Sequence, residues 1–183
     1  MAVQSKIDLD IFQLIIEVIT KSDNVDTMAN QLTQILVGAL GIKGATIFIL
    51  NTELEALEIL ASSGLSINYI NKGPVLVDKS IKLAANREPV IISDVTTSDR
   101  LQYPENAKEE DIRAIVSLPI TLRGKIVGAL RLYHSEVWNI SEQDVENLQV
   151  LAQNIGIALM YFRLANVVQS MKETVNEVHS VWL

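Results

Sequence analysis

Two strand-like runs around a short turn, within residues 112–135, constrain the fold most strongly. In the first run the even-numbered residues are apolar while several odd-numbered ones are polar, and the second run follows the same rule. Side chains alternate between the two faces of a strand, so the pattern predicts an antiparallel hairpin with one apolar face. The apolar residues are Ala114, Val116, Leu118, Ile120 and Leu122 in the first run, and Ile126, Leu130 and Leu132 in the second.

The register of this hairpin follows if both apolar sets share one face. Leu122 then lies opposite Ile126, which leaves a three-residue loop centred on Gly124. The same register places Ser117 opposite Arg131 on the other face. That second face carries a few separated polar groups on an apolar floor, which is typical of a small-molecule pocket.

The rest of the chain predicts further helices and a second hairpin, from the spacing of apolar residues and the position of turn formers. Residues 64–111 are less regular, and a segment this long inside an orderly domain is more often functional than idle. The expected helices span residues 8–21, 28–39, 79–86 and 104–110, and the expected strands span residues 45–51, 57–62 and 89–93.

A long C-terminal helix is expected after Ser141, which is a good N-cap. One apolar stripe along it is expected to pack on the sheet, and a second to extend beyond the domain as the dimer helix of a parallel homodimer. We therefore divide the chain into an N-terminal helix (1–23), a domain (24–163) and a helical extension (164–183). The first stripe is Leu148, Leu151, Ile155, Ala158, Phe162 and Ala165, and the second is Leu164, Val168, Met171, Val175, Val178 and Trp182.

Composition excludes several classes of protein. The net charge of −7, without a cluster of Lys and Arg, argues against a nucleic-acid partner. The absence of cysteine excludes disulfides, thiolate metal sites and cysteine nucleophiles. The N-terminus lacks the pattern of a signal peptide, and no uninterrupted apolar run reaches about 18 residues. We therefore expect a cytoplasmic protein with no membrane partner.

The order and spacing of several short motifs resemble those of a GAF domain, a regulatory fold related to PAS domains, over about residues 24–162. The resemblance implies an α+β fold, with a six-stranded antiparallel sheet, the terminal helices on one face, and residues 64–111 closing a pocket on the other. It also implies a sensor of small molecules or light, or a dimerisation module, that signals to an output domain or protein. The motifs are Pro89-Val90-Ile91-Ile92-Ser93-Asp94, Ser117-Leu118-Pro119-Ile120, the Gly124 turn, Val127-Gly128-Ala129-Leu130, Ile140-Ser141-Glu142-Gln143-Asp144 and Leu151-Ala152-Gln153-Asn154-Ile155.

The sequence departs from the family's known motifs in ways that exclude several classes of ligand. Members that reduce methionine sulfoxide and members that attach a bilin depend on cysteine, and the Asn-Lys-Phe-Asp-Glu signature of cyclic-nucleotide binders is missing. His134 and His179 are poorly placed as haem ligands. We expect no covalent bilin, no haem and no metal. The chain offers no paired nucleophile and base, so we do not expect an enzyme.

Six residues are candidates for ligand binding. Arg113 and Arg131 share the pocket-side face of the hairpin, where a guanidinium can bind a carboxylate or phosphate through two hydrogen bonds. The alternative is that each pairs with a carboxylate of residues 64–111. Asp94 is more simply a turn-forming residue, and Tyr103 is either a lid or a loop anchor. The candidates are Arg113, Ser117, Arg131, Tyr133, Asp94 and Tyr103.

Two functional hypotheses follow. The first is a sensor module that binds a small molecule, with anions among the candidates. Binding of this molecule alters the packing of the C-terminal dimer helix. The alternative is a ligand-free module for dimerisation or protein interaction, whose pocket is filled by its own side chains.

Overall fold

The computed structural model of the chain describes residues 7–76 and 88–180, with side chains up to residue 174. The helix expected over residues 79–86 lies outside the described residues. The helices are α1 (Leu9–Lys21), α2 (Val25–Leu40), α3 (Ile67–Ile70), the 3₁₀ helix η1 (Val95–Thr97), α5 (Pro104–Glu109) and α6 (Glu142–Ser180), and the strands are β1 (Gly44–Asn51), β2 (Ala56–Ser63), β3 (Val75–Leu76), β4 (Val90–Ile92), β5 (Ala114–Leu122) and β6 (Lys125–His134).

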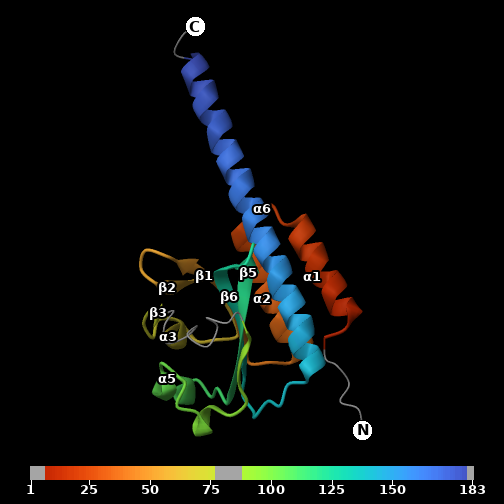
Figure 1. Ribbon diagram of the computed structural model, residues 1–183, viewed down its shortest axis with the longest axis vertical. Coiled ribbons are helices and arrows are strands. Elements are labelled where there is room, and N and C mark those ends of the chain that lie inside the picture. The colour runs from red at the N-terminus through yellow and green to blue at the C-terminus, as the bar shows by residue number, and fades with distance from the viewer. Residues whose placement is uncertain (1–6, 77–87, 181–183) are drawn as a thin grey trace.

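Six antiparallel strands form one sheet in the order β3-β2-β1-β6-β5-β4. Helices α1, α2 and α6 lie on one side of the sheet, and α3 and α5 lie on the other (Figure 1). This arrangement confirms the predicted α+β fold with its six-stranded antiparallel sheet. The described residues between β2 and β5 that lie outside the strands, including α3 and α5, cover the sheet face opposite the long helix (Figure 1).

The tight turn of the β5–β6 hairpin differs from the prediction. Leu122 pairs with Lys125 and not with Ile126, so the loop has two residues, Arg123 and Gly124. Both have positive φ, at 48° and 73°. Positive φ at both central residues is the requirement of a type I′ turn, whose twist matches that of the strands.

A β-bulge in the same hairpin restores the predicted register for the strand residues beyond it, on the side away from the turn. The pairing shifts by one residue between Ile120 and Thr121, and the predicted pair Ser117–Arg131 is confirmed. A bulge places two residues of one strand opposite one of the other and so inverts the alternation beyond it. Ile126 therefore packs on the pocket side of the sheet, and Val127 takes the predicted place of Ile126 against the helices.

The main core lies between the sheet and the three long helices. The predicted apolar face of the hairpin lies there, since Val116, Leu118 and Ile120 are buried against the helices together with Leu130 and Leu132. The first stripe of α6 faces them, and most of its residues are buried. Its buried members are Leu148, Leu151, Ile155, Ala158 and Phe162.

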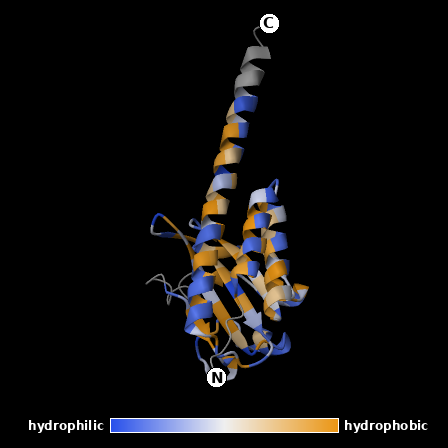
Figure 2. Ribbon diagram, turned by 90° about the vertical axis from the view of Figure 1, so that its right-hand side faces the viewer, coloured by the Kyte–Doolittle hydropathy of each residue, from blue (hydrophilic) through white to orange (hydrophobic). Residues whose placement is uncertain are grey.

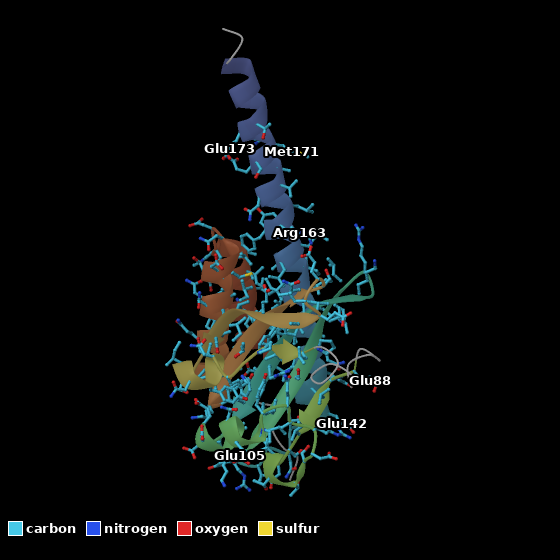
Figure 3. All side chains as sticks on the ribbon, turned by 90° about the vertical axis from the view of Figure 1, so that its left-hand side faces the viewer. Glu88, Glu105, Glu142, Arg163, Met171 and Glu173 are labelled. Atoms are coloured by element: carbon cyan, nitrogen blue, oxygen red, sulfur yellow. The ribbon has the colours of Figure 1, made fainter. Side chains whose placement is uncertain are left out.

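Helix α6 begins at the predicted cap, where the Oγ of Ser141 accepts a hydrogen bond from the amide of Asp144 at 3.1 Å. Its second half leaves the domain, and hydrophobic residues continue along it (Figure 2). Side chains such as Met171 and Glu173 project from this half with no other described part of the chain beside them (Figure 3).

The length and composition of Glu142–Thr174 within α6 would suffice to cross a membrane. This corrects the expectation drawn from uninterrupted apolar runs. One stripe of apolar residues in the first half of α6, which includes Leu148, Leu151 and Ile155, is buried against the sheet, and this is the packing of a core helix. The absence of a membrane partner stays a prediction.

Candidate functional site

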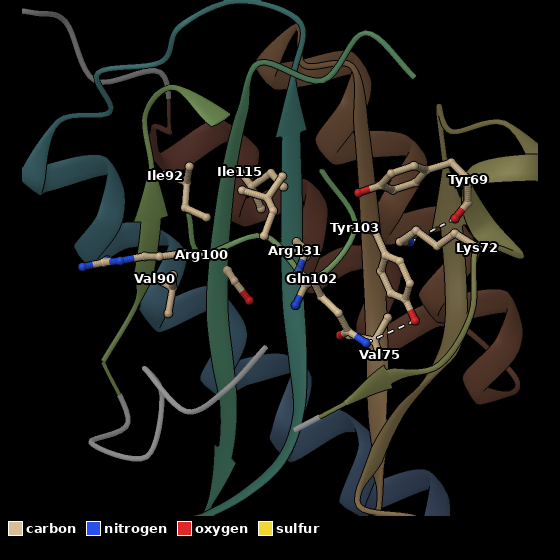
Figure 4. Close-up of a pocket in the computed structure, with 12 residues that line it drawn as sticks. Tyr69, Lys72, Val75, Val90, Ile92, Arg100, Gln102, Tyr103, Ile115 and Arg131 are labelled. Atoms are coloured by element: carbon tan, nitrogen blue, oxygen red, sulfur yellow. Dashed lines mark hydrogen bonds between the residues drawn. The ribbon is translucent and has the colours of Figure 1, made fainter. Parts of the chain in front are cut away.

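A cavity of about 60 Å³ lies on the sheet face opposite the long helices. Its floor comes from β5 and β6, its sides from β4 and the α3–β3 segment, and its cover from the loop before α5 (Figure 4). Described residues within the segment 64–111, such as Tyr69, Gln102 and Tyr103, thus cover the cavity, as the family resemblance implied. The lining residues are Tyr69, Lys72, Val75, Val90, Ile92, Arg100, Leu101, Gln102, Tyr103, Ile115, Ser117 and Arg131.

The described lining of this cavity is cationic. Lys72 and Arg131 contribute two positive groups, and the described lining includes no aspartate or glutamate. Arg100 borders the cavity but is exposed, and its guanidinium points away from the other lining residues (Figure 4). The nearby Glu110 is engaged elsewhere, because it accepts a hydrogen bond from the amide of Ser66 at 2.8 Å and lies 3.9 Å from the Nζ of Lys43. The cavity therefore favours a negatively charged guest.

Lys72 is held among aromatic rings. Its Nζ lies 3.8 Å from the ring centroid of Tyr69 and 5.9 Å from that of Tyr103, and it donates a hydrogen bond to the carbonyl oxygen of Tyr69 at 2.9 Å. Burial, with a smaller contribution from the neighbouring Arg131, lowers the pKa of Lys72 from 10.5 to about 8, although Glu110 opposes the shift. Lys72 consequently changes charge close to neutral pH.

Anion affinity should therefore fall as the pH rises through about 8, by about tenfold between pH 7 and 9.5, because the charge-assisted contact to Lys72 is lost. The ligand-free domain should respond in the opposite direction. A lysine with a depressed folded-state pKa binds fewer protons in the folded state, so its contribution to stability increases between pH 8 and 10.5. Calorimetric titration across this range tests the affinity, and Lys72→Arg should remove the dependence since arginine stays charged. If the anion affinity of Lys72→Arg still fell with pH as in the wild type, Lys72 would not be the group that causes the pH dependence.

Arg131 lies on the floor beside Ser117, which β5 presents from the opposite register position. Its guanidinium carbon lies 5.2 Å from the ring centroid of Phe48. The neighbouring Tyr133 is buried and packs edge-on against Tyr69, with 5.7 Å between ring centroids. Burial raises the pKa of Tyr133, and its hydrogen bonds with Thr46 and Arg131 only partly offset that shift. The Tyr133 hydroxyl is therefore neutral and serves as a fixed hydrogen-bonding group beside Arg131.

Gln102 and Tyr103 tie the cover of the cavity to β3. The hydroxyl of Tyr103 and the Nε2 of Gln102 donate to the carbonyl oxygen of Pro74 at 2.8 and 2.9 Å. The amide of Leu76 donates to the Oε1 of Gln102 at 3.2 Å. Gly73 makes room for this contact, since a Cβ there would lie 2.7 Å from the Tyr103 hydroxyl. Tyr103 is thus a loop anchor that also lines the cavity.

The structure separates the six sequence-predicted residues into two groups. Ser117, Arg131 and Tyr103 line the cavity, and Tyr133 is buried beside it, in contact with the lining residue Tyr69. Arg113 and Asp94 do not line it. They form an ion pair with each other at 3.2 Å at the end of the sheet. Direct contact of any of the six with a ligand stays a prediction.

Asp94 is a structural residue, as the simpler interpretation held. Its Oδ1 accepts hydrogen bonds from the amide of Thr96 at 3.0 Å and from the Thr96 hydroxyl at 2.6 Å, which caps η1. These bonds, with a smaller contribution from Arg113, hold the pKa of Asp94 below its usual range. Arg113 shares the pocket-side parity of β5 but precedes the first strand residue, where η1 and not the cavity lies against the chain.

Lys72, Tyr69, Arg100 and Gln102 were not predicted. They lie in the irregular segment, where no periodicity indicates which side chains point toward the sheet. The composition of residues 64–111 gave no signal either, since acidic side chains outnumber basic ones there.

Comparison with known proteins identifies the family of this chain. The sequence pattern described as the GAF domain matches residues 22–160 of the chain. The chain belongs to the GAF domain family. No curated protein matches it at a significant level.

Solved GAF domains share the fold of this one at low sequence identity. The GAF domain of a phosphoenolpyruvate-protein phosphotransferase from Coxiella burnetii is 17% identical with a TM-score of 0.78, over 91% of this chain and 99% of that one. A free methionine-R-sulfoxide reductase from Neisseria meningitidis, in complex with its substrate, is 16% identical with a TM-score of 0.72, over 85% and 89%. The phycocyanobilin-bound GAF domain of a cyanobacterial phytochrome is 17% identical with a TM-score of 0.70, over 87% and 98%. At these identities the likeness establishes the fold alone.

Proposed function

We propose that this GAF domain is a cytoplasmic signal-transduction sensor that binds a small anion in the cavity and passes the signal through its C-terminal dimer helix. GAF domains generally are sensor or regulatory modules. The observation that carries the proposal is the cationic lining, in which Lys72 and Arg131 face a space whose described lining includes no aspartate or glutamate. In this proposal the protein acts by binding and not by catalysis, and it uses no metal, haem or bilin.

The size of the cavity favours a compact ligand. About 60 Å³ holds a few water-sized groups, which suits a carboxylate or a phosphate with a short carbon chain. A guanidinium such as that of Arg131 can bind either group through two hydrogen bonds. The aromatic rings of Tyr69 and Tyr103 exclude water from one side and so strengthen the electrostatic attraction. Two of the similar solved structures hold a small molecule, so the fold itself tolerates a ligand.

Strand β6 gives a physical route from the cavity to α6. Arg131 points to the cavity, while its neighbours Leu130 and Leu132 point to the other face and belong to the core that contains α6. A ligand that favours one position of Arg131 also favours one position of β6. It can shift α6 only by its difference in affinity for the two arrangements.

A thermal-shift series with acid and amide pairs tests this proposal. The protein is heated with acetate or acetamide, with succinate or succinamide, and with inorganic phosphate, at low ionic strength. At least one anion should raise the melting temperature saturably, because a ligand that binds only the folded state stabilises it by mass action. The matched amides should have no effect. Equal shifts with acids and amides would contradict anion selectivity.

The alternative of a ligand-free dimerisation or interaction module is favoured by one observation. Gln102 and Tyr103 occupy the cover of the cavity and bond to each other and to Pro74, which leaves only a small volume. In that case the positively charged side chains of the lining would contribute only to the stability of the fold. No saturable shift with any member of the series would support this second function.

A further inference from the structure

A second hollow, here called the α6 groove, lies on the helix side of the sheet. Its floor comes from β1, β5 and β6, and its walls come from α6 and the first residue of α2. Its volume of about 430 Å³ far exceeds the 60 Å³ of the cavity on the other face, and small-molecule sites commonly occupy about 300–1,000 Å³. The apolar side chains of the lining include Ile49, Leu122, Val127, Leu159, Phe162 and Val167.

The groove follows from the way in which α6 leaves the sheet. Helix and strand lie close at Gly156, where a Cβ would be 3.0 Å from the carbonyl oxygen of Thr121. The helix then continues past the end of β5 at Leu122, and Arg163 lies on the part of α6 that leaves the domain (Figure 3). The space between helix and strands is filled by no described side chain.

Apolar side chains around the groove stay partly uncovered. Ile49 is 37% exposed and Val167 is 46% exposed. Leu122, Val127 and Leu159 are half-buried. A guest that covers this surface gains free energy in proportion to the apolar area removed from water. The groove therefore favours a guest with a hydrocarbon part.

One edge of the groove is positively charged. Arg163 belongs to the lining and forms no ion pair or hydrogen bond with a described residue. Lys125 pairs with the lining residue Leu122, so the two side chains lie on the same face of the hairpin. The side chain of Asn166 adds an amide donor to the lining. A guanidinium can bind a carboxylate through two hydrogen bonds.

Acidic side chains do not offset this charge. The described lining of the groove includes no aspartate or glutamate. Glu58 pairs with the lining residue Ile49, but it lies on β2, on the side of β1 away from the hairpin, and accepts a hydrogen bond from the amide of Asn51 at 2.7 Å. The α6 edge of the groove therefore favours a negatively charged head group.

We propose that the α6 groove binds a free amphipathic acid, whose hydrocarbon chain covers the apolar lining and whose carboxylate pairs with Arg163. At about 30 Å³ for each heavy atom, the groove holds roughly 14 atoms, which is enough for decanoate. This second site goes beyond the proposed function, because it lies on the other face of the sheet and needs neither Lys72 nor Arg131. An occupant contacts both the sheet and α6, so it stabilises one direction of the helix relative to the domain.

Methyl NMR of the full chain, titrated with decanoate below its micelle concentration, tests the site. The methyl signals of Leu122, Val127 and Leu159 should move saturably. Those of Val90 and Ile115 should stay in place, because they line the first cavity, which is too small for the chain. Decyltrimethylammonium, with the same chain and the opposite charge, should bind about tenfold more weakly, and butanoate should not move the groove signals. Equal affinity of the two decyl compounds would overturn the proposal, as would decanoate shifts at the first cavity alone.

Arg163→Glu tests the head-group contact, and Lys172→Glu is the matched control. Lys172 is also exposed on α6, but it lies about 14 Å farther along the helix, beyond the screening length of about 10 Å in ordinary buffer. Arg163→Glu should weaken decanoate binding by about tenfold, because an attraction becomes a repulsion, and Lys172→Glu should leave it unchanged. Equal effects of the two variants would overturn the pairing with Arg163. Groove signals that move with protein concentration and not with decanoate would assign the groove to a second copy of the chain and overturn the proposal.

Discussion

Replacing Arg131 with alanine is expected to weaken anion binding by about tenfold to a hundredfold, because a hydrogen bond to a charged group contributes about 1.5–3 kcal/mol. Arg131 lines the cavity from the central strand β6, and its neighbours Ser117 and Tyr133 fix its surroundings. Isothermal titration with the anion that stabilises the wild type most strongly measures the loss. Arg131→Lys should recover only part of the affinity, because lysine keeps the charge but not the two-point geometry.

The matched control for this result is Arg113→Ala. Arg113 has the same charge and the same parity on the neighbouring strand, but it pairs with Asp94 and lies outside the cavity. Its loss should leave anion affinity unchanged and should change the stability of the fold little, because exposed ion pairs contribute little to it. If Arg131→Ala folds normally and keeps full affinity, or if both variants weaken binding equally, the cavity is not the anion site.

Gly128→Ala is expected to cause the largest loss of stability, about 3 kcal/mol or more. A Cβ at residue 128 would lie 2.1 Å from the carbonyl oxygen of Phe48, and the neighbouring atoms are backbone of the paired strand β1. Backbone in the centre of a sheet cannot move aside cheaply, so the two central strands must separate. Urea unfolding monitored by circular dichroism measures the change.

Gly38→Ala serves as the control for Gly128→Ala. Gly38 lies in α2, and no atom lies within 4 Å of the position of its Cβ. Alanine there should stabilise the protein by about 0.5–1 kcal/mol through the higher helix propensity of alanine. Opposite signs for the two substitutions are therefore expected. A similar small effect of both would show that β1 and β6 do not approach as closely as the structure has them.

The fold was predictable where apolar and polar residues alternate, or where apolar residues recur at helical spacing, over many residues. The apolar positions of β5, such as Leu118, identified the helix-facing side because strand geometry leaves a single solution. The same logic failed at Ile126, since a two-residue turn and a bulge together preserve the overall register while inverting the local parity. Nothing in the alternation distinguishes that arrangement from a three-residue loop.

The site was predictable only as far as the regular strands reach. Arg131 and Ser117 followed from their register on the hairpin, whereas Lys72 and Arg100 depend on the path of an irregular segment. Arg113 was wrongly predicted to line the cavity. Odd or even position along a strand assigns a residue to a face of the sheet but does not show where the strand begins, and η1 lies against the beginning of β5.

Native mass spectrometry of the wild type and of Arg131→Ala, each equilibrated with the same mixture of small acids and their amides, tests the central claim most directly. It reads the number of subunits and the mass of any bound compound together. We expect a wild-type dimer that carries one acid per subunit, and an Arg131→Ala dimer at the bare polypeptide mass. A wild type that binds no acid from the mixture, or the same adduct on both proteins, would contradict an anion site at Arg131.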